Sequence, residues 1–407
     1  MTRQPPVARV SQSGLPLSGI HVLDLTQYVS GPFCTMLLAE LGADVIKVEP
    51  PTMGDVYRQQ GPSFLGGVST SFLSMNRNKR SLTLDLKRDE AREVVRRLAG
   101  RMDAVVENFK PATAERLGVG HEALHAVNPG VVHCSISGYG RTGPHAGLGG
   151  YDLMAQARGA IMAVTGPDED TPTKVGVPIV DLATGVYAAL GITAGLLSRE
   201  RGGGGRRIDV GLLDTAVSFL PMLLTEYQAT GVLPKPLGNA SPFFAPYEGF
   251  RTRDGFITLV GTGGKGHWDS LCKVLGLTGL LNDPRFASNS DRVARRTELH
   301  QIIEEVLVTD TSERWIGRLR EVGLPCDPLQ NLDAVLEDPQ VRSRAMIGTY
   351  RHPQAGNVVF TTSPLAADGG RRPSSPPPLL GQHTREILEW LGFSDQEVEG
   401  LAAAGVV

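Results

Sequence analysis

Short apolar runs alternate with helical segments in the first half of the chain, and this alternation restricts the fold more than any other feature. The run from Ile20 to Leu25 precedes a helical segment from Phe33 to Leu41, and the apolar run from Asp44 to Val48 follows at once. A helix between two such runs is the usual crossover between parallel strands. The order continues through Arg88 to Arg101, Asp103 to Glu107 and Val131 to Ser137. The pattern predicts an α/β fold, with helices on the faces of a parallel sheet.

The alternation stops near residue 225, where prolines and glycines become frequent. Prolines break helices and central strands, and four of them follow closely: Pro234, Pro236, Pro242 and Pro246. We therefore expect a flexible leader at 1–16, a large domain at 17–224, a smaller α+β domain at 225–330 and a C-terminal segment at 331–407.

The composition is that of an ordinary globular protein. The 407 residues carry a formal net charge of -3, which leaves no strongly basic footprint for nucleic acid. Apolar runs such as Val217 to Leu224 are shorter than the roughly 20 residues that a membrane span needs, and the N-terminus lacks the apolar region of a secretory signal. Four dispersed cysteines without a C-x-x-C pair favour reduced thiols. We expect a cytoplasmic protein with no nucleic-acid or membrane partner.

Several common catalytic motifs are missing. The turn after Leu25 reads TQYVSGP, without the glycines of a dinucleotide-binding loop, and no Ser or Thr follows the Gly-Lys pair in the loop from Gly261 to Gly266. The sequence has no G-x-S-x-G elbow and no H-E-x-x-H helix, and its histidines show no ligand spacing. We therefore expect no nicotinamide site, no P-loop, no serine hydrolase and no metal site.

Asp181 is the carboxylate of most interest. It stands after an apolar, strand-like approach, at the start of a long helix rich in Ala, Leu, Val and Gly. One interpretation is an N-cap, a very common use of Asp, and local sequence alone favours it. The other is a nucleophile, kept ionised by the helix dipole in an apolar pocket, that attacks an activated carbonyl.

A series of phrases resembles the class III CoA-transferases, the family of formyl-CoA transferase and carnitine CoA-transferase. The phrases follow one another in the family's order from about residue 17 to 390, which makes the set far more specific than any one of them. They are LSGIHVLDLTQYVSGP, LLAELGADVIKVEPP, NRNKRSLTLDLK, VVENFKPATAERLG, SISGYGRTGP, VPIVDLATGVYAALGI, RIDVGLLDTA and PPPLLGQHTREIL.

The resemblance implies that Asp181 is the nucleophile, followed four residues later by the family's Gly at Gly185. It also implies that coenzyme A and acyl-CoA are substrates, with no cofactor bound permanently. Charged and aromatic side chains suit phosphate and adenine. The implied CoA contacts are Leu84, Lys87, Asn108, Phe109, Arg116, Tyr139, Gly140 and Arg141. Val29 and Pro50 replace a Gln and an Arg of formyl-CoA transferase, which argues against formyl or oxalyl substrates.

The glycine loop resembles, more loosely, a mobile loop that closes over the nucleophile in formyl-CoA transferase. We hypothesise that the N–H groups of Gly261, Gly263 and Gly264 shield or stabilise an anhydride, because glycine permits close approach of the backbone. The alternative is a plain turn before a helix at His267.

The implied reaction moves CoA from an acyl-CoA donor to a small carboxylic acid, through a mixed anhydride and an aspartyl-CoA thioester on Asp181. One alternative is a 2-methylacyl-CoA racemase of the same superfamily, which shuttles a proton through a His in a G-H-D phrase. This chain has Gly150, Tyr151 and Asp152 there, and Tyr is a poor shuttle because its pKa lies near ~10. The other alternative is an inactive acyl-CoA-binding member, which the retained Asp181 disfavours.

The resemblance also extends the fold prediction. It implies a Rossmann-like large domain that binds CoA and carries catalysis, to which the C-terminal segment returns. It further implies that two chains interlock as a homodimer, a topology that composition and periodicity do not reveal.

Overall fold

The computed structural model describes residues 14–262, 264, 266–365 and 374–407. The chain divides into two compact units, which are described separately below. The large unit consists of Met1–Ala160, Val175–Thr225 and Arg342–Val407, and the small unit consists of Ile161–Lys174 and Glu226–Val341. The N-terminal and C-terminal parts of the chain therefore meet in one unit.

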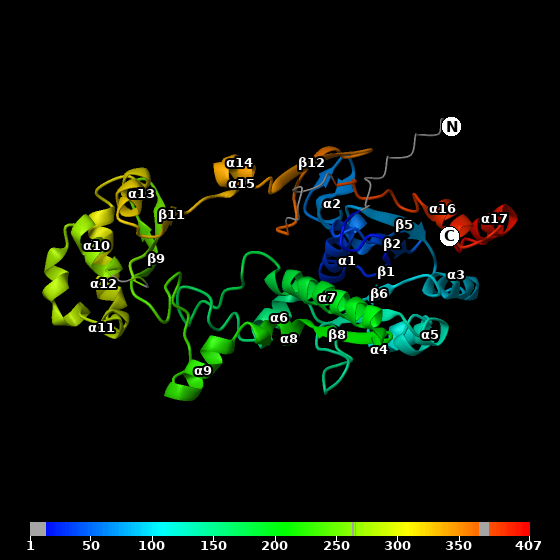
Figure 1. Cartoon of the computed structure of the whole chain (residues 1–407), viewed down its shortest axis with the longest axis horizontal. Helices are drawn as coiled ribbons and strands as arrows, with labels where there is room; N and C mark the ends of the chain where they lie inside the picture. Colours follow the sequence, from blue (N-terminus) through cyan, green and yellow to red (C-terminus); the bar gives the residue numbers. More distant parts are fainter. Residues whose placement is uncertain (1–13, 263, 265, 366–373) are drawn as a thin grey trace. The chain divides into compact units, whose positions relative to one another are not determined.

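A six-stranded parallel sheet forms the centre of the large unit, in the order β5-β2-β1-β6-β7-β8 (Figure 1). Five of the strands, all but β8, are buried almost throughout, as expected for parallel strands covered on both faces. The predicted α/β class and parallel sheet are confirmed. The strands are β1 (His21–Leu25), β2 (Asp44–Glu49), β5 (Lys79–Thr83), β6 (Ala104–Glu107), β7 (Val132–Ser137) and β8 (Arg206–Gly211).

Helices and short ribbons surround this sheet. The helices are α1 (Ser30–Glu40), η1 (Val56–Arg58), α2 (Thr70–Met75), α3 (Asp89–Ala99), α4 (Pro111–Arg116), α5 (His121–Val127), α6 (Asp152–Arg158), α7 (Ile179–Ser198), η2 (Arg199–Gly203), α8 (Leu212–Ser218), α16 (Thr384–Trp390) and α17 (Asp395–Ala403). The ribbons pair β3 (Phe64–Leu65) with β4 (Val68–Ser69), and β12 (Ile347–His352) with β13 (Gly356–Thr361). Helices α9 (Pro221–Thr230) and α15 (Pro339–Ser343) lie where the chain passes between the units.

The strand order reverses between β1 and β6, and sheets of this kind bind ligands at that point, beyond the carboxyl ends of the strands. The loops that leave these two strands are joined. The side-chain oxygen of Asn108 accepts the N–H of Gln27 at 3.1 Å, and its amide nitrogen donates to the carbonyl of Gln27 at 2.8 Å. The turn after β1 and the loop after β6 are thus fixed side by side.

Helix α7 packs against α1 and against strands β7 and β8. A Cβ atom on Gly185 would lie 2.7 Å from the carbonyl oxygen of Ser30, 3.0 Å from the ring of Phe33 and 3.2 Å from the nitrogen of Cys34. No side chain fits in that space, so the glycine four residues after Asp181 allows the two helices to touch. The strand-like approach expected before Asp181 is wrong, because residues 171–178 form turns and loop and α7 begins at Ile179.

One expectation about apolar length also needs correction. The segment Ile179–Gly203 is long and apolar enough to cross a membrane by length and composition, unlike shorter runs such as Val217–Leu224. The core helix of a soluble protein passes the same test. Here the residues of α7 that face α1 and the sheet are buried, among them Ala188, Ile192 and Leu196.

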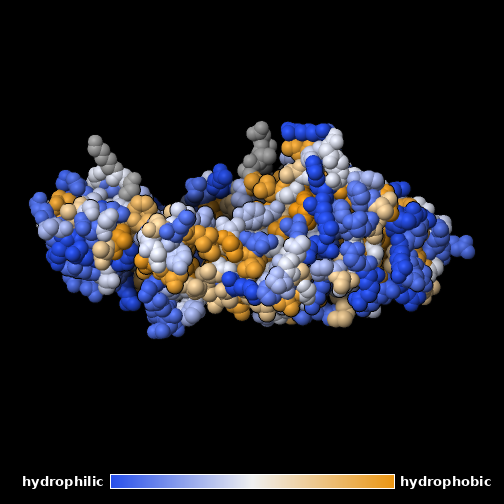
Figure 2. Space-filling view, turned by 90° about the horizontal axis from the view of Figure 1, so that it is seen from below, coloured by the Kyte–Doolittle hydropathy of each residue, from blue (hydrophilic) through white to orange (hydrophobic). Residues whose placement is uncertain are grey.

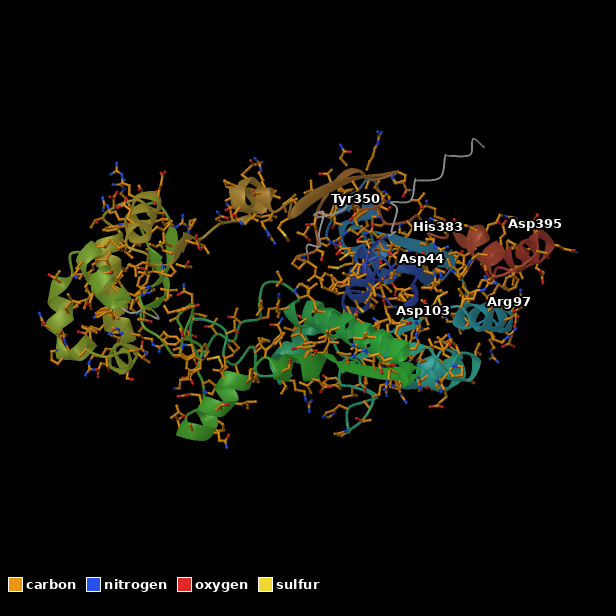
Figure 3. The ribbon with its side chains drawn as sticks, in the orientation of Figure 1. Asp44, Arg97, Asp103, Tyr350, His383 and Asp395 are labelled. Atoms are coloured by element: carbon orange, nitrogen blue, oxygen red, sulfur yellow. The ribbon has the colours of Figure 1, made fainter. Side chains whose placement is uncertain are left out.

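The C-terminal segment packs against the edge of the sheet near β5. The Tyr350 hydroxyl donates to the carbonyl of Leu73 at 3.0 Å, and the ring nitrogen Nδ1 of His383 accepts the N–H of Ser81 at 3.2 Å (Figure 3). The segment ends in the helices α16 and α17, and α17 begins with a capping box at Ser394.

The small unit has its own sheet and core. Its antiparallel sheet has the order β11-β10-β9, and the core around it contains Phe250, Phe286 and Trp315. The elements are β9 (Tyr247–Arg251), β10 (Phe256–Val260), α10 (His267–Val274), η3 (Thr278–Asn282), η4 (Pro284–Phe286), α11 (Asn289–Ala294), α12 (Arg296–Leu307), α13 (Ser312–Glu321), β11 (Cys326–Pro328) and α14 (Leu332–Glu337). The expected domain boundaries differ from the limits of these units and stay a prediction.

The contact between α1 and α7 gives a first prediction. Gly185→Ala places a methyl group against main-chain atoms that cannot move aside, so we expect the free energy of unfolding to fall by about 1–3 kcal/mol in denaturant titrations. Gly400→Ala is the matched control, since nothing lies within 4 Å of its Cβ in α17, and it should gain up to about 1 kcal/mol. Equal stability changes in the two variants would contradict the close approach.

Candidate functional site

Asp181 is the third residue of α7, and its side chain does not cap the helix. The N-cap position belongs to Pro178, which has no side-chain cap hydrogen bond. The N-cap interpretation of Asp181 is therefore wrong. Its carboxyl group is partly exposed instead of folded back onto the first turn, and it accepts a hydrogen bond from Ser30, the first residue of α1.

Another carboxylate caps α7 in its place. The Oδ1 atom of Asp152 accepts the N–H of Val180 at 2.8 Å and the N–H of Asp181 at 3.3 Å. The other oxygen accepts from the buried amide of Gln156, whose own oxygen accepts the N–H of Val175 at 2.9 Å. Asp152 and Gln156, both on α6, thus fix the segment that leads into α7. This cap could not be recognised from the sequence, because Asp152 and Val180 are 28 residues apart along the chain.

The environment raises the pKa of the Asp181 carboxyl to about 6. Burial is the largest cause and the neighbouring charge of Asp152 is the second, while the hydrogen bond from Ser30 acts in the opposite direction. The hypothesis that the helix dipole keeps this group ionised stays a prediction, and burial and like charge act against ionisation. A carboxylate with such a pKa is more basic than an ordinary Asp and still largely ionised at neutral pH.

A layer of buried ion pairs lies beside the turn after β1. Lys47 pairs with Asp55 at 2.8 Å and Lys79 pairs with Asp24 at 3.0 Å, and all four side chains are fully buried. Burial opposes the ionisation of Asp24, but Lys79 and Lys47 outweigh it and lower the pKa of Asp24 to about 2. The sequence carried a signal, since charged residues stand inside the apolar strands HVLDL and DVIKVE.

Two of the implied CoA residues lie at the reversal of strand order. Asn108 and Phe109 follow β6, and the Phe109 N–H donates to the carboxylate of Glu107 at 2.8 Å. Lys87, in the loop after β5, and Arg116, the last residue of α4, are both exposed, and neither forms an ion pair with another described residue. Cations with this freedom suit phosphate groups.

The other implied CoA residues have different surroundings. Leu84 is buried in the core, so its side chain does not face solvent. The guanidinium of Arg141 already pairs with Glu107 at 3.1 Å. Gly140 adopts a φ of 79°, a conformation that side chains disfavour, and the ring of Tyr139 contacts His145. The CoA contacts as a set stay a prediction.

The glycine loop belongs to the small unit, whereas Asp181 belongs to the large unit. A Cβ on Gly261 would meet Leu271 and Pro246, and one on Gly264 would meet the ring of His267, where α10 begins. Gly263 lies outside the described residues. A role of this loop at the nucleophile stays a prediction.

The large unit thus combines a parallel α/β sheet with the carboxyl group of Asp181 at the start of α7, hydrogen-bonded to the first residue of α1. Residues 17–384 match CoA-transferase family III. The chain is 38% identical over 394 residues to succinyl-CoA:glutarate CoA-transferase of Homo sapiens, covering 96% of this chain and 90% of that protein. It is 35% identical to succinyl-CoA:D-citramalate CoA-transferase of Chloroflexus aurantiacus, covering 96% and 98%.

A solved structure shows the same fold. The crystal structure of a CAIB/BAIF family protein from Brucella suis has a TM-score of 0.82 and 36% identity, over 93% of this chain and 99% of that one. The chain therefore belongs to CoA-transferase family III and is an enzyme of that family.

The raised pKa of Asp181 predicts a pH-dependent cost to stability. The folded pKa of about 6 exceeds the unfolded value near ~3.9, so the protonated form favours folding at low pH and this contribution is lost as the pH rises through 6. Asp181→Asn should therefore raise the free energy of unfolding at pH 7.5 by about 2 kcal/mol, and by much less at pH 4.5. Denaturant titrations at both pH values test this, and a variant less stable than wild type at pH 7.5 would contradict it.

Proposed function

We propose that the chain transfers CoA from an acyl-CoA to a carboxylic acid with Asp181 as the covalent nucleophile. The carboxyl group of Asp181 carries this proposal: it lies at the start of an apolar helix, accepts a hydrogen bond from Ser30, and is made unusually basic by burial and by Asp152. Its partial exposure allows a thioester to reach it. The membership of CoA-transferase family III supports the reaction class.

The proposed reaction proceeds in two symmetrical halves. Asp181 attacks the thioester carbonyl, the carbon–sulfur bond breaks, and CoA leaves as a thiolate, which is a good leaving group because thiols ionise near pKa ~8.5. The thiolate then attacks the aspartyl carbonyl of the mixed anhydride and expels the donor acid. An acceptor carboxylate reverses these steps on the aspartyl-CoA thioester, so that the thioester bond energy is kept.

We further propose dicarboxylic acids as the substrate class, with succinyl-CoA as a donor. The relatives that support this are named for succinyl-CoA with glutarate and with D-citramalate, and both acids are dicarboxylates. A panel of acyl-CoA donors against mono- and dicarboxylic acids, with new thioesters identified by mass, tests this choice.

The nucleophile is tested by Asp181→Asn. We expect transfer to fall by at least about 1,000-fold while CoA still binds, because the variant keeps the shape of the side chain and loses only the attacking oxygen. Asp395→Asn is the matched control, an exposed Asp in the first turn of α17, and should keep full activity. Hydroxylamine added during turnover should leave a hydroxamate at Asp181, which peptide mass spectrometry detects.

Two outcomes would contradict this proposal. Full transfer by Asp181→Asn would remove the covalent role. Exchange of the α-hydrogen of a 2-methylacyl-CoA in deuterated water, without any acceptor acid, would favour the racemase instead.

We also propose that a second copy of the chain covers an apolar face of the large unit. The face shown in Figure 2 has hydrophobic areas, coloured orange, near its middle. Large exposed apolar side chains are unusual in such number on a monomer. Those of α7, α8 and the start of α9 are Val186, Tyr187, Leu190, Leu197, Val217, Phe219, Met222 and Leu224.

The proposed homodimer can be tested by a charged substitution on this surface. Leu190 is 62% exposed, and Leu190→Glu should dissociate the dimer or prevent its assembly, as measured by sedimentation over a dilution series. Val359→Glu, at a position 60% exposed on β13, should leave the dimer intact. A stable folded monomer of the wild type at micromolar concentration would contradict the proposal.

A further inference from the structure

Three tyrosines from separate segments of the large unit gather near Asp181. Tyr28 lies in the turn after β1, Tyr57 lies in η1, and Tyr151 directly precedes Asp152, which caps the helix of the nucleophile. The ring of Tyr28 meets the ring of Tyr57 edge-on with 5.5 Å between centroids, and the ring of Tyr151 with 6.1 Å. The three phenol groups therefore form one connected cluster.

The buried carboxylate of Asp55 accepts hydrogen bonds from the main-chain N–H groups of Tyr57 and Tyr28. The Oδ1 atom of Asp55 accepts the N–H of Tyr57 at 2.9 Å and lies 3.5 Å from the nitrogen of Tyr28. The Oδ2 atom pairs with the buried Lys47, whose ammonium group also donates to the carbonyl of Thr26 at 2.7 Å. The cluster thus stands on a rigid base, because every charge beneath it is paired.

Tyr28 has a backbone conformation that a bulky residue rarely adopts. Its φ of 70° lies in the left-handed region, which costs roughly 1–2 kcal/mol for a residue with a Cβ atom. The bonds between Gln27 and Asn108 fix the neighbouring residue. Strain of this kind persists where the surrounding contacts determine the conformation, and it concentrates at functional sites.

The hydroxyl of Tyr57 has no hydrogen-bond partner among the residues that the structure describes, so it can meet a ligand. Burial raises the pKa of Tyr57 most, and the charge of Asp181 raises it next, so the phenol stays protonated and lies within the field of the nucleophile. Asp181 accepts its hydrogen bond from Ser30 and not from Tyr57. The hydroxyl of Tyr28, by contrast, is engaged with Tyr151.

An acid substrate needs such a neutral donor. Its carboxylate must approach Asp181, beside which the carboxylate of Asp152 already lies. The cations closest in the sequence to Tyr57 are committed elsewhere, since Arg58 pairs with Glu49 at 2.6 Å and Lys47 is buried in its own pair. A nearby positive charge would lower the basicity of the nucleophile. A neutral phenol can bind the incoming carboxylate by a hydrogen bond without this effect.

We propose that Tyr57 is a further catalytic residue, whose hydroxyl binds the carboxylate of the acid substrate. The phenol donates a hydrogen bond to the carboxylate oxygen that does not attack. As the other oxygen forms its bond to the aspartyl carbonyl and CoA leaves with the electron pair of the broken carbon–sulfur bond, the bound oxygen becomes the carbonyl oxygen of the anhydride. No proton leaves the phenol. This inference rests on the proposed CoA transfer.

Tyr57→Phe tests the role, because it removes the hydroxyl and keeps the ring. With succinyl-CoA as donor and glutarate as acceptor, we expect kcat/KM for the acid to fall about 10- to 100-fold, as for the loss of a hydrogen bond to a charged group. The KM for the acyl-CoA, the affinity for CoA and the midpoint of the pH–rate profile should not change. A profile shifted to higher pH would mean that Tyr57 acts through Asp181, and unchanged kinetics with the acid would also overturn the proposal.

Two further variants make the result specific. Tyr28→Phe should cost less than Tyr57→Phe, because the Tyr28 hydroxyl is already engaged, and a larger loss would move the role to Tyr28. Tyr350→Phe removes a buried hydroxyl far along the chain and should lower stability but leave the KM for the acid unchanged. If wild-type protein neither transfers CoA nor gives a hydroxamate at Asp181 with any donor and acid tried, the proposed function fails, which is distinct from failure of the Tyr57 role.

Discussion

The contact between the start of α7 and the start of α1 is the constraint on which the site depends. Gly185 lets the helices approach until Ser30 reaches the carboxyl group of Asp181, and that approach buries the carboxyl group enough to raise its pKa to about 6. A larger residue at 185 would separate the carboxyl group of Asp181 from Ser30 at the start of α1. The spacing of four residues between Asp181 and Gly185 therefore has a steric cause, since both positions lie on the same side of one helical turn.

The electrostatics of the large unit show two solutions to the burial of charge. Beneath the turn after β1, Lys47 and Asp55 neutralise each other, and this pair adds rigidity without reactivity. At Asp181, by contrast, no cation pairs with the carboxyl group among the described residues, and the neighbouring carboxylate of Asp152 increases the cost of its charge. The ion pair of Lys47 and Asp55 positions the main chain, whereas Asp181 remains an unpaired and unusually basic carboxylate.

Sequence reasoning found the parallel sheet because its signal is local: apolar runs, short crossovers and glycine stops follow one another along the chain. The family resemblance then selected Asp181 where the local pattern favoured a cap. The true cap, Asp152, could not be derived, because its partners are the main-chain N–H groups of Val180 and Asp181, and any carboxylate brought there by the fold would serve. The cluster of Tyr28 and Tyr57 was missed for a similar reason, since Asp55 joins them through the backbone and leaves no mark on either residue type.

The basicity of Asp181 also gives the proposed reaction its direction. In the mixed anhydride, the CoA thiolate can attack either carbonyl, and the attack that expels the weaker base is faster. A substrate carboxylic acid resembles a Glu side chain, with a pKa near ~4.3, and is the better leaving group when Asp181 has a pKa of about 6. Thiolate attack is therefore biased toward the aspartyl carbonyl, which forms the aspartyl-CoA thioester and releases the donor acid. The burial that makes a charged Asp181 costly for folding thus favours, in the proposed reaction, release of the donor acid from the mixed anhydride.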